Sequence, residues 1–377
     1  MWKDHLCIII AIEHYNPLGL IRSLGEAGVN PIYIAIKGRV KIASASKYIS
    51  KCHYADDIKE GYDILQREYG NVAEKAGKKP YVFCCDDKTI GYLDYHYNEL
   101  KNRFLAFNAG SQGRINEFMD KNNILELARR HGLNVLESRV CRKGEIPQGL
   151  SFPIITKSIS PNEGGWKSDV HICHSDSELR MAYEEIEAST VLVQRYIEKE
   201  NEYCMEGFSA NRGNDVLIAI ASTYNYLLPG YYSPYMTVGN MRNEQIRTAL
   251  EGMLKEIGFE GIFEAEFLID QSGNYYFSEI NFRNSTWSYA ATKAGMPLPV
   301  LWAETQEKGC IKPEAYKEFE AFRAMAEPID YAKRVKTGKI DKAKWLLDFK
   351  ETECGYYYST DDIEPWRICI ENWDNLG

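Results

Sequence analysis

Long apolar runs and basic runs are scarce in this chain of 377 residues. The opening sequence MWKDHLCIIIAIEHYN holds one short apolar run before Glu13 and His14, which predicts a buried first strand and argues against a signal peptide or a membrane span. The net charge is −9, and no basic run exceeds a few residues. Because a nucleic-acid surface needs a basic patch, we expect neither nucleic acid nor a membrane as a partner.

Cysteine pairs with metal-binding spacing are also lacking. The ten cysteines are scattered and none forms a CxxC pair, which argues against a zinc site. Most of them lie inside apolar, strand-like runs, where cysteine behaves as a small buried hydrophobe. This usage is typical of the reducing cytosol, so we expect a cytoplasmic protein.

Familiar nucleotide-binding and catalytic motifs are missing as well. The chain has no GxGxxG motif, which leaves a dinucleotide-binding interpretation with little support, and no GxxxxGK[ST] motif of the P-loop type. No Ser/His/Asp or Cys/His arrangement is evident. A mechanism built on an activated serine or cysteine nucleophile therefore has no support.

Residues 1–115 alternate between apolar strands and amphipathic helices. The expected strands are Leu6–Ile12, Pro31–Ile36, Tyr48–Tyr54 and Tyr81–Cys85. Alternating strands and helices predict a parallel sheet with helices on both faces, so we expect an α/β N-terminal domain over these residues.

Residues 116–310 have a mixed α+β pattern, which places a domain boundary near residue 115. A charged helix is expected over Asn116–His131, with Asp120 as a cap, and strands are expected over Pro153–Ser158 and Val191–Tyr196. Residues 311–377 are expected to be a C-terminal extension with helix-like stretches, to which the sequence assigns no role. A chain of this length is expected to form two or three domains.

The segment EAEFLIDQSGNYYFSEINFR, residues 264–283, is the most informative part of the chain. The tetrapeptide QSGN lies between two β-rich runs and predicts a hairpin. Side chains alternate along a strand, so Glu279 and Asn281 share a face that Glu266 can reach from the other strand. Two carboxylates and an amide oxygen suit Mg²⁺, and Arg283 adds a cation of the kind that accompanies phosphoryl transfer.

An ordinary hairpin whose polar face meets water is the alternative interpretation. Two observations favour a site. Glu279, Asn281 and Arg283 interrupt otherwise apolar residues, and a polar turn at Asn284–Ser288 precedes an apolar helix. A polar cluster between a strand and a helix is typical of a binding site.

The sequence EINFRNSTWSYAATKAGMPLPVLW, residues 279–302, resembles the metal-binding strand and following helix of the ATP-grasp superfamily. The resemblance extends from about Leu6 to Leu301. It implies that an α+β ATP-grasp fold, with two α+β subdomains that clamp ATP, follows the N-terminal domain, with the lid subdomain at about 150–200. It also implies that Mg²⁺, or Mn²⁺ in its place, is bound by Glu266, Glu279 and Asn281. Arg283 would contact the transferring phosphoryl group.

Two lysines resemble the phosphate-binding lysines of that superfamily. Lys157 ends the strand PIITK, and the loop SISPNEGGWK follows. The resemblance implies that Lys157 contacts the α- and β-phosphates of ATP and that Gly164 and Gly165 lie in the lid. Without the resemblance, this segment could be a simple hairpin loop with a flanking lysine. Lys121, in the Asp-Lys pair that opens a helix, would also reach the phosphates, although Asp120 has a separate explanation as an N-cap.

The segment VLVQRYI, residues 191–197, resembles the hinge strand that contacts adenine in the superfamily. The implied nucleotide-binding residues are Gln194, Arg195, Tyr196 and Ile197. Arg195 stands where glutamate is usual, but the adenine contact there is made mainly by the main chain. Glu202 is implied to bind the ribose hydroxyls, with Glu200 as the neighbouring candidate.

These resemblances imply an ATP-dependent carbon–nitrogen ligase in which Arg283 and Lys157 are the catalytic residues. A carboxylate, expected to come from an amino acid, would be activated as an acyl-phosphate and joined to an amine, with release of ADP and phosphate. The opening segment and the tail resemble the group that contains D-aspartate ligase and carbamoyl-phosphate-synthase-like ligases. We therefore expect a small-molecule carboxylate and amine as partners, and the sequence is compatible with a homodimer.

Two alternatives stay open at this point. One is an ATP-binding regulatory module without turnover, and the other is a bicarbonate-dependent carboxylase or a carbamoyl-phosphate-type enzyme. A tyrosine-rich stretch over Tyr224–Arg242 is expected to border the acceptor pocket. Whether Lys167 and Arg242 contact substrate is left open.

Overall fold

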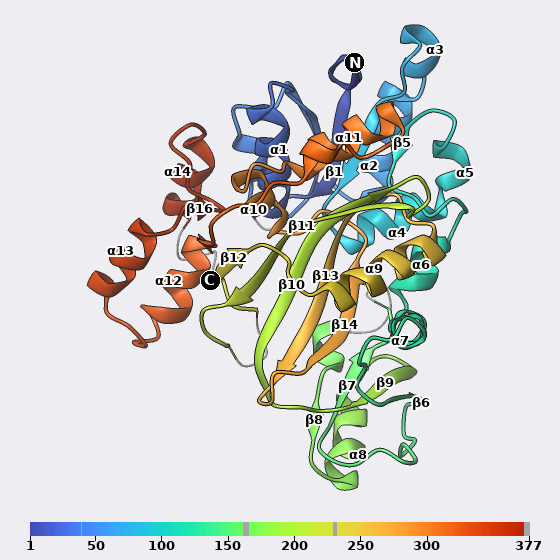
Figure 1. Ribbon diagram of the computed structural model, residues 1–377, viewed down its shortest axis with the longest axis vertical. Coiled ribbons are helices and arrows are strands. Elements are labelled where there is room, and N and C mark those ends of the chain that lie inside the picture. Colours follow the sequence, from blue (N-terminus) through green and yellow to red (C-terminus); the bar gives the residue numbers. More distant parts are fainter. Residues whose placement is uncertain (39, 161–165, 229–231, 373–377) are drawn as a thin grey trace.

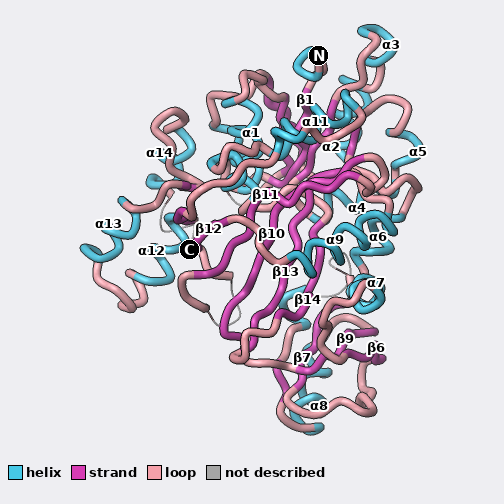
Figure 2. Tube along the Cα trace, viewed as in Figure 1, coloured by secondary structure: helices cyan, strands magenta, loops and turns pink. Residues whose placement is uncertain are grey.

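The computed structural model describes residues 1–38, 40–160, 166–228 and 232–372. The described chain forms three sheets that follow one another along the length of the molecule (Figures 1 and 2). The N-terminal sheet lies at one end, a large sheet occupies the middle, and a small sheet lies at the other end. No helix among the described residues combines the length and apolar character needed to cross a bilayer.

The N-terminal sheet is parallel, with the strand order β3-β2-β1-β4-β5. Every residue of β1 except the last is fully buried, as expected for a strand covered on both faces. The strands are β1 (Cys7–Ile12), β2 (Ile32–Ile36), β3 (Lys51–Ala55), β4 (Tyr81–Cys84) and β5 (Leu105–Ala106). The helices are α1 (Asn16–Glu26), α2 (Ile58–Ile64), α3 (Val72–Ala76), α4 (Asp87–Tyr95) and α5 (Tyr97–Leu100). The predicted parallel α/β sheet is confirmed.

The helix predicted over Asn116–His131 is broken into α6 (Arg114–Met119) and α7 (Lys121–Arg130). The break lies at Asp120, whose backbone is extended and whose side chain accepts hydrogen bonds from the N–H groups of Asn122 and Asn123 at 2.9 and 3.0 Å. Asp120 is therefore the predicted cap, and the prediction of one continuous helix was wrong. The cap starts a new helix with Lys121 at its first position.

The small sheet is antiparallel, with the order β6-β9-β7-β8, and helix α8 (Asp176–Glu185) belongs to the same part of the chain. Its strands are β6 (Ser138–Arg142), β7 (Ile154–Ser158), β8 (Ile172–Cys173) and β9 (Thr190–Arg195). We call this part the lid subdomain. It has a small apolar core of its own, built around Ile154, Leu179 and Val193.

The large sheet has the order β14-β13-β10-β11-β12-β15-β16 and is antiparallel except between its last two strands. Its strands are β10 (Lys199–Ala210), β11 (Asp215–Tyr224), β12 (Tyr235–Gly239), β13 (Gly261–Asp270), β14 (Tyr275–Asn281), β15 (Phe322–Met325) and β16 (Cys354–Gly355). The helices of this part are α9 (Glu244–Ile257), α10 (Ser288–Lys293), α11 (Leu298–Lys308), α12 (Glu327–Arg334), α13 (Lys342–Lys350) and α14 (Glu364–Glu371). Residues beyond 310 thus complete the large sheet with β15 and β16.

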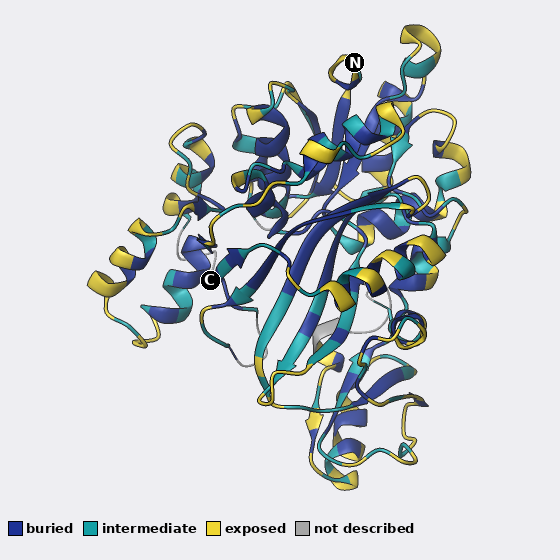
Figure 3. Cartoon of the chain, in the orientation of Figure 1, coloured by how far each residue is buried: buried dark blue, intermediate teal, exposed yellow. Residues whose placement is uncertain are grey.

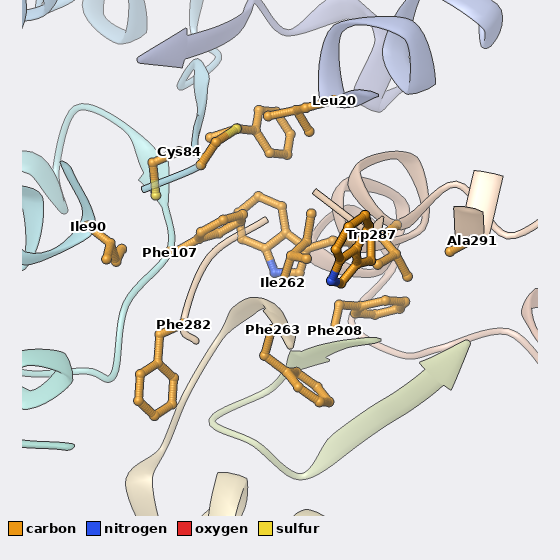
Figure 4. Close-up of a cluster of buried hydrophobic side chains, with 14 of the residues drawn as sticks. Leu20, Cys84, Ile90, Phe107, Phe208, Ile262, Phe263, Phe282, Trp287 and Ala291 are labelled. Atoms are coloured by element: carbon orange, nitrogen blue, oxygen red, sulfur yellow. The ribbon is translucent and has the colours of Figure 1, made fainter. Parts of the chain in front are cut away.

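A shared apolar core fixes the N-terminal sheet to the large sheet. Figure 4 shows side chains from both sides of this junction, including Cys84 of β4, Phe208 of β10 and Ile262 of β13. The Trp302 ring of α11 packs edge-on against Phe107 at a centroid distance of 5.0 Å. Toward the lid, by contrast, the strands of the large sheet change from buried to partly exposed (Figure 3). This partly exposed region is where a ligand can approach the sheet.

Glu327 provides a test of the packing around α12. Its side chain is fully buried and accepts hydrogen bonds from the N–H groups of Tyr357 and Tyr358, both at 3.0 Å. Burial raises the pKa of this carboxyl to about 7. The folded protein keeps this proton to a higher pH than the unfolded chain does. The contribution of Glu327 to the free energy of unfolding is therefore fully present below the pKa of the unfolded chain, and it is lost as the pH rises through the pKa of the folded protein.

We expect Glu327→Gln to remove this dependence, which amounts to roughly 3 kcal/mol between about pH 4.5 and pH 8. Urea unfolding of wild type and variant across this range measures it. Glu318→Gln, at an exposed site, is the control and should keep the wild-type slope. Parallel stability curves for wild type and Glu327→Gln would contradict the assignment.

Candidate active site

A cleft of about 480 Å³ lies where the N-terminal sheet, the start of α7 and the partly exposed end of the large sheet meet. Its lining includes many charged side chains and a few aromatic ones. The charged residues are Asp87, Lys121, Lys199, Glu202, Glu264, Glu266, Glu279 and Arg283, and the aromatic residues are Phe118, Tyr224, Tyr232, Phe282 and Trp287.

Strand register brings the predicted metal ligands together. Glu266 of β13 lies directly opposite Glu279 of β14, and the Asn281 amide donates a hydrogen bond to Glu266 Oε1 at 2.9 Å. A bulge in β14 between Phe277 and Glu279 is essential to this arrangement. It lets Phe277 pack on Phe267 in the interior while Glu279 faces the cleft beside Glu266.

Several carboxylates lie close together in this part of the cleft, and they shift one another's pKa values. Burial, followed by the charges of Glu279 and Glu264, raises the pKa of Glu266 well above its ordinary value. The nearby Lys121 ammonium lowers the pKa of Glu279. Among the described residues, no group of three or more His, Cys, Asp or Glu side chains is arranged so that it could bind a metal ion. The predicted set combines two carboxylates with an amide, and it would need Glu279 to exchange Lys121 for a metal ion.

Both predicted phosphate-binding lysines lie near these acids. Lys121 Nζ donates a hydrogen bond to Glu279 Oε2 at 2.5 Å. Lys157 Nζ donates to Gln194 Oε1 at 3.0 Å, so the lysine of β7 and the glutamine of β9 are neighbours in the lid. Burial, followed by the charge of Lys121, lowers the pKa of Lys157 to about 8. A partly buried lysine whose charge is disfavoured by burial and by a second lysine is a good receptor for an anion.

The predicted hinge residues lie at the end of β9 and just after it, and two of their backbone N–H groups already donate hydrogen bonds within the protein. The Arg195 and Tyr196 N–H groups donate to Glu137 O and Pro153 O at 2.8 and 2.9 Å. These two N–H groups therefore do not face a ligand, and the predicted adenine contact through backbone N–H rests on Ile197. The Arg195 guanidinium lies 5.9 Å from the centre of the Tyr276 ring.

Glu202, the predicted ribose ligand, lines the cleft and pairs with Lys199. Its alternative, Glu200, is exposed. The structure therefore favours Glu202 of the two. Gly164 and Gly165 lie outside the described residues, as does the side chain of Lys167. Arg242 pairs with Glu318 at 2.7 Å and is largely exposed, whereas Tyr224 and Tyr232 of the tyrosine-rich stretch do line the cleft.

Arg283 connects the large sheet to the N-terminal domain. Its Nε donates to Asp87 Oδ1 at 2.8 Å, and its Nη2 donates to Asn281 Oδ1 at 3.1 Å. Asp87 is the first residue of α4, and the cap of that helix is its neighbour Asp86, which accepts from the Thr89 N–H at 2.8 Å. The Asp87 carboxylate is thus directed at the cleft.

Sequence reasoning missed two buried acids behind the predicted metal ligands. Glu264 lies opposite both Asn281 and Glu206, and Glu206 accepts hydrogen bonds from the Ser285 and Ser288 hydroxyls at 2.7 and 2.6 Å. Burial raises the pKa of Glu206 to about 7. The alternation of side chains along a strand could have identified both acids. It places Glu264 on the same face of β13 as Glu266, and Glu206 on the same face of β10 as Glu202.

Comparisons with known proteins relate part of this chain to a family of ATP-binding domains. Residues 120–304 match the family model of the carbamoyl-phosphate synthase L chain, ATP binding domain. The chain is 23% identical over 251 residues to the 2-oxoglutarate carboxylase small subunit of Hydrogenobacter thermophilus. The aligned region covers 60% of this chain and 47% of that protein. The chain thus spans about half the length of this curated relative.

Solved structures share the fold at low sequence identity. L-amino acid ligase from Bacillus licheniformis matches with a TM-score of 0.62 and 12% identity, over 85% of this chain and 79% of that one. The biotin carboxylase domain dimer of Hydrogenobacter thermophilus 2-oxoglutarate carboxylase, solved with MgADP, ADP and bicarbonate, matches with a TM-score of 0.60 and 17% identity, over 84% and 73%. The chain therefore has the ATP-grasp fold, and its residues 120–304 match the ATP-binding domain of the carbamoyl-phosphate synthase L chain.

Proposed function

We propose that this protein is an ATP-dependent ligase that activates a carboxylate and joins it to an amine. ATP would phosphorylate the carboxylate, and the amine would displace phosphate from the acyl-phosphate to form a carbon–nitrogen bond. The observation that carries the proposal is the convergence of Glu266, Glu279 and Asn281 with Lys121 and Arg283 in one cleft. Cations and oxygen donors in this arrangement suit a triphosphate and its metal ion.

The residues present fit a magnesium ion. Glu266 and Glu279 supply two carboxylates, and Asn281 supplies an amide oxygen. Burial, together with the neighbouring carboxylates, raises the pKa of Glu266, so a metal cation there would be favoured. These three side chains would hold Mg²⁺, which supplies charge neutralisation for phosphate oxygens when it is bound. Mn²⁺ suits the same oxygen donors.

The other side chains have separate tasks. Lys121 and Lys157 would bind phosphate oxygens of ATP, and Glu202 would accept hydrogen bonds from the ribose. Arg283 would bind the transferring phosphoryl group beside the carboxylate. Phosphoryl transfer of this kind needs positioning and charge neutralisation rather than a covalent nucleophile.

Bicarbonate is the second candidate for the activated acid. The observation in its favour is the similarity to the 2-oxoglutarate carboxylase small subunit and to the biotin carboxylase domain solved with bicarbonate. For an amino-acid carboxylate, including one activated by a D-aspartate-ligase type of enzyme, the supporting observation is the fold match to L-amino acid ligase, which covers 79% of that structure. A regulatory module without turnover would be expected to have lost charged groups from the cleft, but Lys121, Glu266, Glu279 and Arg283 are all in place.

A mass-spectrometric screen with ATP and Mg²⁺ tests the proposal. Pairs of amino acids, with D-aspartate included, are incubated with the protein, and a parallel series contains bicarbonate. The proposal predicts ADP together with a condensation product whose mass is that of the two reactants less water. ADP formation that depends on bicarbonate alone would favour the second candidate. ATP binding without stimulated ADP formation by any acid would contradict both.

Lys157 offers a test of the nucleotide site that does not require turnover. We expect Lys157→Met to weaken binding of a non-hydrolysable ATP analogue by roughly ten- to a hundredfold, because a charge-assisted phosphate contact is lost. Isothermal titration calorimetry measures this affinity. Lys350→Met, at an exposed position of α13, is the matched control. Equal affinities of wild type and Lys157→Met would remove Lys157 from the nucleotide site.

A further inference from the structure

Four ion pairs among the described residues line the cleft. They are Lys121 with Glu279, Lys199 with Glu202, Arg283 with Asp87, and Arg283 with Glu264 at 3.8 Å. Under the proposed function, Glu279 receives the metal ion and Glu202 the ribose. The acid of the third pair, Asp87, has no ligand under that function, although it belongs to the same cleft.

A purely structural role explains the Asp87–Arg283 pair poorly. The N-terminal sheet is already fixed to the large sheet by the shared apolar core and by reciprocal backbone hydrogen bonds between Asn108 and Glu260, at 3.0 and 2.7 Å. The Asp87 side chain keeps 29% of its surface exposed and lines the cleft instead of the core. Asp86, and not Asp87, caps α4.

The charges of the cleft-lining side chains determine which kind of ligand the Asp87 carboxylate can bind. Glu202, Glu264, Glu266 and Glu279 line the same cleft, so a second anionic group beside Asp87 would be repelled. Once Arg283 binds the phosphoryl group of the activated acid, the Asp87 carboxylate needs another cation. The cationic reactant in amide synthesis is the ammonium form of the amine. The aromatic rings of Tyr232 and Trp287, packed edge to face at 5.5 Å, line the same cleft and suit a cationic neighbour.

We propose that Asp87 is the binding residue for the attacking amine, so that the Asp87–Arg283 pair is exchanged for an amine on Asp87 and an acyl-phosphate on Arg283. This inference rests on the proposed ligase function and adds the site for its second substrate. The carbon–nitrogen bond forms as the bond between the acyl carbon and the phosphate oxygen breaks, and phosphate leaves with the bonding electrons. Of the two protons that the ammonium sheds, one ends on phosphate and the other in solvent.

The test compares two nucleophiles on the same activated acid. Hydroxylamine is largely uncharged near neutral pH and traps acyl-phosphates as hydroxamates, whereas the amine found in the screen arrives as a cation. We expect Asp87→Asn to raise the KM of that amine and to lower the ratio of amide to hydroxamate formation by roughly ten- to a hundredfold, since a charge-assisted contact is lost. Asp87→Glu, which keeps the charge, should recover most of the ratio.

Asp63→Asn is the matched control, because Asp63 lies in an exposed pair with Lys59 on α2. It should leave the ratio at the wild-type value. An unchanged ratio of amide to hydroxamate in Asp87→Asn would overturn the inference. If both rates fell together, Asp87 would act only by holding Arg283, and if neither fell, Asp87 would have no role in the reaction. Failure of the ligase function itself has a different signature, because wild-type protein would then form neither hydroxamate nor amide.

Discussion

Replacing Glu279 with Gln is expected to lower ATP-dependent product formation by about a hundred- to a thousandfold, the scale typical for loss of a group that stabilises charge in a transition state. Glu279 lies at the centre of the site, opposite Glu266 and in contact with Lys121. Glutamine keeps the size of the side chain but removes the negative charge that a metal ion would need. Lys121 would also lose the partner that holds it in the cleft.

Steady-state ADP release, measured with the acid and amine from the screen, gives the size of this effect. Glu126→Gln is the matched control, because Glu126 is exposed on α7, the helix that begins with Lys121. The control should retain wild-type turnover. If Glu279→Gln turns over ATP within about threefold of wild type, the metal site cannot be where we place it, since one lost charge contact alone is worth more than that.

The second large effect concerns stability, at residues that do not line the cleft. Asp362→Ala is expected to lower the free energy of unfolding by about 3–5 kcal/mol, as is typical when one partner of a buried ion pair is removed. The Arg22 and Asp362 side chains are 0% and 1% exposed, and they meet at 3.0 Å. The Asp362 carboxylate also accepts hydrogen bonds from the Ser46 hydroxyl and the Lys47 N–H, at 2.8 and 2.9 Å.

This cluster fastens the C-terminal segment onto the N-terminal domain. Loss of the Asp362 carboxylate would leave the buried Arg22 guanidinium with backbone carbonyls of residues 356, 357 and 362 as its hydrogen-bond acceptors among the described residues. Urea unfolding near neutral pH measures the change. Asp361→Ala, at the exposed neighbouring position, controls for loss of an aspartate in the same turn and should cost much less. A loss below about 1 kcal/mol for Asp362→Ala would show that the pair is replaced by water or by another partner.

The parts of the fold that follow from local pattern were predictable. Apolar runs such as Cys7–Ile12 and Ile32–Ile36 announce buried parallel strands, and QSGN announces the turn between β13 and β14. The convergence of Glu266, Glu279 and Asn281 also follows from the alternation of side chains. Even the bulge has a signal, because the apolar positions of β14 step by three residues between Phe277 and Ile280.

The remainder depends on contacts that no local pattern encodes. Arg22 and Asp362 are 340 residues apart in sequence, and Asp87 meets Arg283 across 196 residues. The strand β16 has only two residues, too few to show an alternation. The break at Asp120 was missed because the residues on both sides of it favour a helix, and only the geometry of the cap separates α6 from α7.

The central claim is that this cleft transfers a phosphoryl group from ATP to a carboxylate. The most direct measurement uses the acid from the screen, labelled with oxygen-18 in its carboxylate, and follows the released phosphate by ³¹P NMR. An acyl-phosphate leaves one carboxylate oxygen on the phosphate, so we predict phosphate that carries a single oxygen-18 atom in step with product formation. Product formed together with unlabelled phosphate would contradict the account.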